Sequence, residues 1–174
     1  MSHFSWLRAL ALLLMCPPAI AADALVNAAQ EAQTFAGCML TMNADCVVRS
    51  EDIDAYLRLA NERSNERLSE SQFATLQTRF FESMKRDVRQ YVRWEVTTPG
   101  KPFSINSSLY VFVPYIQVTR SRDGESTVRA VLIGTSKDHG ATWKFIDGHA
   151  MTPSDLKVVI PGYSGLPALP GGSG

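Results

Sequence analysis

The sequence predicts an α+β fold in which N-terminal helices pack on one face of a curved antiparallel sheet of about four strands, followed by a short C-terminal helix. Apolar residues recur every three or four positions in the first half of the chain, which is typical of amphipathic helices. From residue 91 the period changes to two, and turn signals then separate several β-rich segments. The 174 residues are enough for one domain with one core.

The first 22 residues have the layout of a secretory signal peptide. Arg8 precedes the apolar run Ala9–Met15, and two prolines and three alanines follow it before residue 23. The run is shorter than the about 20 apolar residues that a membrane-spanning helix needs. Cleavage after Ala21 fits the small-x-small rule, and cleavage after Ala22 fits nearly as well. We therefore expect a periplasmic or secreted protein that meets the membrane only on its export route.

The cysteines agree with an exported protein. Cys38 and Cys46 remain after residue 22, and an isolated pair in an oxidising compartment usually forms a disulfide. Their spacing is wider than the Cys-x-x-Cys of redox-active pairs, so we expect a structural bridge. Cys16 leaves a lipid anchor open as an alternative, although Met15 stands where a small residue normally precedes a lipidated cysteine.

Helical patterns fill the chain up to about residue 88. Residues 24–35 are rich in alanine, with apolar positions on one face. Ser50 is placed to cap a second helix, over residues 53–60. Ser69 and Gln72 form a capping box at the start of a third helix, whose apolar residues keep spacings of three and four.

Strand patterns follow. Residues 91–96 alternate between apolar and polar types, and residues 109–119 and 127–135 are rich in β-branched and aromatic residues. Asp123-Gly124 is a hairpin turn signal between the last two segments. Because Pro114 has no amide hydrogen for a strand ladder, we expect a bulge or a sheet edge there.

The end of the chain changes composition. Thr152 and Pro153 are placed as the N-cap and first residue of a short helix. From residue 161 proline and glycine dominate, which predicts a flexible tail. The expected organisation is a signal peptide over 1–22, a single α+β domain over 23–160 and this tail over 161–174.

Residues 136–143 fit the pattern Ser-x-Asp-x-Gly-x-Thr-Trp and resemble the Asp-box, a hairpin motif of sialidases and many other β proteins. Asp138 is expected to accept hydrogen bonds from amides of the turn, and Gly140 to adopt a positive φ. Sialidase propellers carry several copies in a far longer chain, so one copy argues against sialidase activity. The resemblance implies a structural hairpin built by Ser136, Asp138, Gly140, Thr142 and Trp143.

A longer stretch, mainly residues 131–160, is similar to small exported proteins of the nuclear-transport-factor-2-like (cystatin-like) family. The similar residues are Val131–Gly134, Trp143–Gly148, Thr152, Pro153 and Leu156. That family fold packs three helices into the mouth of a curved antiparallel sheet, which forms a cone. Members include steroid isomerases, dehydratases, immunity proteins and non-catalytic binding domains, so the resemblance implies a pocket-forming fold and no single function. The Cys38–Cys46 segment departs from the family pattern.

Recognisable catalytic, metal-binding and phosphate-binding motifs are absent from the sequence. His139 and His149, the histidines of the expected mature chain, lack the spacing of metal ligands. We therefore expect no metal and no cofactor, and no catalytic residue is assigned. Lys+Arg and Asp+Glu number 17 each, so no charge excess favours binding to nucleic acid.

A cone enzyme would need a carboxylate base and a tyrosine or acid donor inside its cavity. The candidate pocket residues are aromatic and lie on predicted strands: Tyr91, Trp94, Tyr110 and Tyr115. Glu95 is expected to face water, and Asp147 to serve as a turn or cap residue.

The leading functional expectation is a non-catalytic periplasmic binding or interaction protein, for example an immunity protein that neutralises a toxic effector. Its partner would be that effector or a second copy of the chain. The alternative is an isomerase- or hydrolase-type enzyme, or a carrier, for a small hydrophobic ligand in the cone. This alternative predicts a cavity that holds a carboxylate with a raised pKa.

Overall fold

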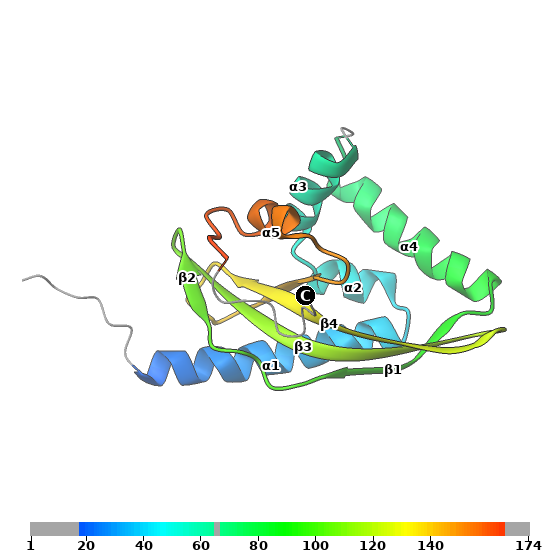
Figure 1. Ribbon diagram of the computed structural model, residues 1–174, viewed down its shortest axis with the longest axis horizontal. Helices are drawn as coiled ribbons and strands as arrows, with labels where there is room; N and C mark the ends of the chain where they lie inside the picture. Colours follow the sequence, from blue (N-terminus) through cyan, green and yellow to red (C-terminus); the bar gives the residue numbers. More distant parts are fainter. Residues whose placement is uncertain (1–17, 65–66, 166–174) are drawn as a thin grey trace, which may run out of the picture.

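A computed structural model of the protein describes residues 18–64 and 67–165, and it confirms the predicted α+β class (Figure 1). Four helices come first in the chain: α1 (Pro18–Leu40), α2 (Ala44–Ser50), α3 (Ile53–Ser64) and α4 (Glu70–Arg86). An antiparallel sheet follows: β1 (Gln90–Val96), β2 (Phe103–Ile105), β3 (Ser108–Ser121), β4 (Gly124–Ser136) and β5 (Lys144–Asp147). The short helix α5 (Pro153–Val159) comes after the sheet.

The sheet has the order β1-β3-β4-β5, and β2 pairs with the other end of β3. The predicted hairpin is present, but its two-residue loop is Arg122-Asp123, one residue earlier than the Asp123-Gly124 signal, and Gly124 pairs with Ser121. Pro114 lies within β3 without a bulge on the β4 side, where it pairs with Val131. On its other side β1 has just ended, so Pro114 occupies a local edge, where its missing amide hydrogen costs no ladder bond.

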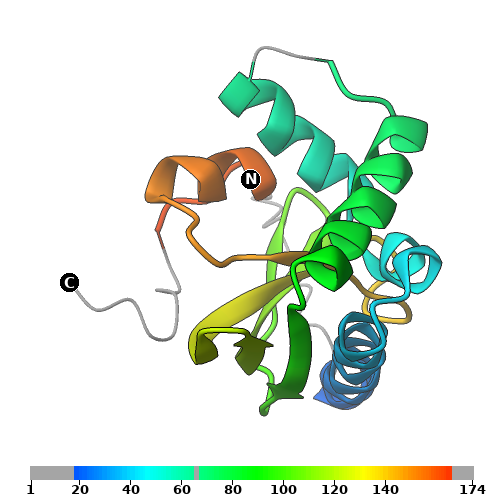
Figure 2. The same ribbon diagram turned by 90° about the vertical axis from the view of Figure 1, so that its right-hand side faces the viewer.

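Helices cover both faces of the sheet, which corrects the expectation of one covered face. Val111 and Val113 of β3 pack with α1, whereas Phe112 between them packs with α3 and α5. Figure 2 shows α1, α2 and α4 on one side of the strands and α5 on the other. The physical reason is the nearly continuous apolar run of β3, since a strand buried on both faces does not alternate with polar residues.

The helix caps follow the sequence at two of three predicted positions. Ser69 forms the predicted capping box with Gln72, and Thr152 caps α5, where its hydroxyl accepts from the amide of Asp155 at 3.2 Å. The assignment of Ser50 as a cap is wrong. Ser50 ends α2, and the carboxylate of Asp52 caps α3 by accepting from the amide of Ala55 at 3.1 Å.

The predicted disulfide between Cys38 and Cys46 is present and joins the end of α1 to α2. Most of the expected signal peptide, residues 1–17, lies outside the described residues, and α1 begins at Pro18. None of the described helices has the length and apolar character that crossing a membrane requires.

The first residues of the expected tail pack on the domain. Tyr163 is 7 % exposed and joins the cluster around α5, and the side-chain amide of Asn106 donates to the carbonyl of Pro161 at 3.0 Å. The packed unit therefore extends beyond the predicted boundary at residue 160. Residues 166–174 lie outside the described residues.

Candidate functional site

The candidate site is a cavity of about 380 Å³ beneath α4, here called the α4 pocket. Helix α4 contacts α2 and α3, and in Figure 2 it stands beside the sheet on the α1 side. The apolar lining of the α4 pocket comes from three helices: Phe35, Met39, Val47, Leu76 and Phe80. Its polar lining consists of Glu51, Tyr56, Gln77, Tyr91 and Asp147. An apolar cavity with a few convergent polar groups is the usual form of a small-molecule site.

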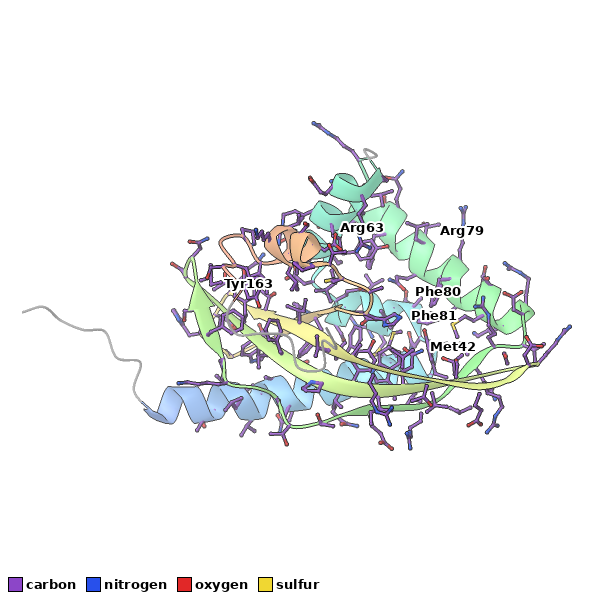
Figure 3. All side chains as sticks on the ribbon, viewed as in Figure 1. Met42, Arg63, Arg79, Phe80, Phe81 and Tyr163 are labelled. Carbon is purple, nitrogen blue, oxygen red and sulfur yellow. A yellow bond between two sulfur atoms is a disulfide. The ribbon has the colours of Figure 1, made fainter. Side chains whose placement is uncertain are left out.

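Two side chains of α4 stand at the opening of the α4 pocket. Leu76 is 41 % exposed and Phe80 is 45 % exposed, although both also line the cavity. Phe81, beside Phe80, is buried, and Figure 3 shows both rings on the side of α4 that faces the sheet. The opening is therefore apolar.

Two carboxyl groups reach the α4 pocket from neighbouring segments. Glu51 lies in the connection between α2 and α3, which runs parallel to β5 and forms a bridge with Phe145. Asp147 is the last residue of β5. Glu51 is 8 % exposed, and the side-chain amide of Gln77 donates to its Oε2 at 3.3 Å.

Hydrogen bonds hold the carboxylate of Asp147. The hydroxyl of Tyr115 donates to Oδ1 at 2.7 Å, and the amide of His149 donates to the same atom at 2.8 Å. Burial raises the pKa of Asp147, while the two hydrogen bonds oppose that rise by favouring the charged form. Asp147 thus serves as a turn residue, as predicted, and in addition as part of the cavity wall.

Glu51 is the most perturbed group that lines the cavity. Loss of water contact raises its pKa to about 8, and the negative charges of Asp147 and Asp52 add to the rise. At neutral pH the side chain therefore carries a proton, which makes it a potential hydrogen-bond donor to a ligand. A carboxyl group with a pKa near the working pH is suited to general acid–base chemistry.

The aromatic residues predicted for the pocket have different places. Tyr91 lines the cavity, and burial, with a smaller effect of the charge of Asp147, raises its pKa to about 12. Trp94 packs against Tyr91 and stacks on Tyr115, with the ring centroids of Trp94 and Tyr115 4.8 Å apart. Tyr110 lies on the opposite face of the sheet, with α5, because side chains alternate along β3.

Sequence reasoning missed Glu51 and Gln77 as site residues. The acidic pair Glu51-Asp52 stands between two helical patterns, where acidic residues usually indicate a helix cap and not a binding site. Gln77 lies between apolar positions of α4 and carries no distinctive signal. Glu95, expected to face water, is exposed on β1.

The Asp-box-like hairpin has the predicted internal geometry. Asp138 accepts from the amide of Thr142 at 2.9 Å, and Gly140 has a φ of +92°. The indole of Trp143 is buried and donates to the carbonyl of Ala24 at 3.1 Å, which fixes the hairpin to α1. Ser136 and Thr142 both hydrogen-bond to Asp138, and none of these residues lines the α4 pocket.

A second cavity, of about 400 Å³, shares Glu51 with the α4 pocket. Its other charged side chains are Arg49, Asp52, Asp54, Lys137 and Lys144. Lys137 and Asp54 form an ion pair at 2.7 Å, and both side chains are exposed, so the charges of these two residues neutralise each other at the surface. Within residues 18–64 and 67–165, no three His, Cys, Asp or Glu side chains come together as a metal site would require.

Comparison with known proteins gives little family information. No family model matches the chain, and no curated protein matches it. The structure is similar, with a TM-score of 0.44 and 11 % sequence identity, to the crystal structure of a SEC-C motif-containing protein from Psychrobacter arcticus. The match covers 74 % of this chain, which thus spans 63 % of the length of that protein.

Proposed function

We propose that the protein binds a small neutral molecule with an apolar body and one carbonyl or hydroxyl group in the α4 pocket, where the protonated side chain of Glu51 donates a hydrogen bond to the ligand. The single observation that carries the proposal is a buried carboxyl group, Glu51, in the wall of an apolar cavity of about 380 Å³, where burial raises its pKa to about 8. This volume lies in the range of about 300–1,000 Å³ that is typical of small-molecule sites.

The side chains that line the α4 pocket indicate which class of ligand it binds. The lining has no lysine, arginine or histidine, and it includes two carboxyl groups. An anionic ligand would meet the negative charge of Asp147 without a cation in the lining to balance it, which is unfavourable. A neutral ligand can instead accept a hydrogen bond from Glu51 or Tyr91 and donate one to Asp147.

Proton exchange distinguishes two uses of the same site. If Glu51 only donates a hydrogen bond, the protein is a carrier. If it moves a proton to or from the bound molecule, the protein is an enzyme of the isomerase type, as the resemblance to nuclear-transport-factor-2-like proteins suggests. The periplasmic location and the immunity-protein role stay predictions.

The test uses 2-naphthol, a neutral aromatic alcohol whose fluorescence reports on its surroundings. We expect saturable binding to the wild type, and loss of binding in Leu76→Trp, because an indole at this half-exposed position fills the opening. Affinity is expected to change near pH 8 as Glu51 ionises, and this pH dependence should be absent in Glu51→Gln. Glu95→Gln, an exposed glutamate outside the pocket, is the matched control.

Equal naphthol binding by the wild type and Leu76→Trp would refute the proposed site. Binding that is lost in Leu76→Trp but independent of pH in the wild type would keep the pocket and refute the role of Glu51. Native mass spectrometry of protein purified from its own host then identifies the natural ligand by mass.

A further inference from the structure

Half of strand β4 has an open edge. Strand β5 pairs only with Leu132–Thr135, whereas β3 pairs with β4 along its whole length. Among the described residues, no strand lies beside residues 124–131 on their outer side, and Figure 2 shows this side of the β3–β4 hairpin uncovered. An unpaired strand edge is a template for pairing with another strand.

The register identifies the backbone groups that point outward. The amide of Gly148 donates to the carbonyl of Val131 at 2.9 Å, so the backbone groups of Val131 face away from β3. In an antiparallel ladder alternate residues face the same way, so Glu125, Thr127 and Arg129 also direct their amide and carbonyl groups outward. Because Gly148 already occupies the carbonyl of Val131, the free edge spans residues 125–129.

This free edge is self-complementary in charge. Thr127 is its central residue, and Glu125 and Arg129 lie two positions to either side with their side chains on one face of the sheet. All three side chains are exposed. A two-fold axis through Thr127 places Glu125 of each copy opposite Arg129 of the other, so opposite charges meet twice.

We infer that β4 is an interface through which two copies of this chain join edge to edge, with Thr127 opposite Thr127 in an antiparallel pair. Glu125, Thr127 and Arg129 of one copy then lie opposite Arg129, Thr127 and Glu125 of the other. Each of these three pairs forms two backbone hydrogen bonds, six in all, and the two Glu125–Arg129 pairs also form ion pairs. If one copy slides by two residues along the other, only two of the three residue pairs remain within residues 125–129, and neither of them brings Glu125 opposite Arg129. The charges that would deter an unrelated strand thus favour this register.

The neighbouring charge on β3 is compatible with this arrangement. Arg120 forms an exposed ion pair with Glu125 at 2.7 Å within the same chain. In the pair of copies Glu125 would lie between Arg120 of its own chain and Arg129 of the other. A carboxylate has two oxygens and accepts hydrogen bonds from both guanidinium groups, although this group of three side chains carries a net charge of +1.

Sedimentation equilibrium on the purified protein tests the inference. We expect a wild-type dimer and, for Arg129→Glu and for Glu125→Arg, each alone, dimerisation weaker by at least about tenfold, since like charges then meet twice. An equimolar mixture of these two variants should recover the dimer, because each glutamate of one chain meets an arginine of the other. Lys101→Glu, the same type of charge reversal in an exposed loop, is the control.

Thr127→Pro probes the backbone. The amide of Thr127 points away from β3, so proline removes an intermolecular hydrogen bond and leaves the internal ladder intact. Circular dichroism checks that each variant is folded, and the mixing experiment decides the matter if the proline variant is not. A wild type that stays monomeric at high concentration overturns the inference, as does a dimer that the charge variants leave unchanged.

Discussion

Glu51→Gln should change how the stability of the protein depends on pH. In the folded protein Glu51 keeps its proton up to about pH 8, whereas in the unfolded chain it loses the proton near the ordinary value of 4.5. Between these values the folded state binds one proton more, so the free energy of unfolding falls by about 1.4 kcal/mol per pH unit as the pH rises. From pH 5 to pH 7 this amounts to about 3 kcal/mol.

Urea unfolding, followed by tryptophan fluorescence at several pH values from 5 to 8, measures the effect. Glutamine has no proton to lose, so the stability of Glu51→Gln relative to the wild type should increase by about 3 kcal/mol between pH 5 and pH 7. Glu95→Gln removes an exposed glutamate and should show no such trend. If the difference between Glu51→Gln and the wild type stays constant across this range, Glu51 does not carry a buried proton, and the chemistry proposed for the α4 pocket loses its basis.

Three further predictions concern the frame around the site. Asp155→Asn should lower the free energy of unfolding by about 1–2 kcal/mol at pH 7, because Asp155 completes the capping box of Thr152 and binds Arg63 at 2.6 Å. These bonds hold the pKa of Asp155 below its ordinary value, so in thermal melts the difference should vanish as the wild type loses this stabilisation on acidification below about pH 4. Gly140→Ala should cost about 2–4 kcal/mol in urea unfolding, since a Cβ at φ +92° would lie 2.3 Å from a side-chain carbon of α1; an unchanged midpoint would contradict this packing. Replacing both Cys38 and Cys46 with Ala should cost about 2–3 kcal/mol, and adding a reductant should then have no further effect on the unfolding midpoint.

Local signals in the sequence were enough to predict the elements that depend on local contacts. The capping box of Ser69, the hairpin turn before Gly124 and the geometry of Asp138 in its turn each involve residues within a few positions of one another. The prediction of one covered sheet face was wrong because the long apolar run of β3 was not used to predict burial on both faces. A run of this kind, with Val111, Phe112 and Val113 in succession, indicates burial on both faces.

The candidate site was only partly predictable. Tyr91 was identified because an aromatic residue on an alternating strand is a plausible pocket residue. Glu51 and Asp147 lie far apart in the chain, and only the pairing of the α2–α3 connection with β5 brings them to one cavity. No spacing rule within a single segment connects such residues, and the raised pKa of Glu51 arises from the packing around it rather than from its sequence neighbours alone.

The attachment of the Asp-box-like hairpin to α1 has a consequence for the order of folding. The bond from Trp143 to Ala24 spans 119 residues, and the bond from Asn27 to Gly140 spans 113. Loop closure over such distances is entropically expensive, whereas the β3–β4 hairpin closes over two residues. Helix α1, the first of the described helices, therefore gains its last contacts only after residue 143 has been synthesised.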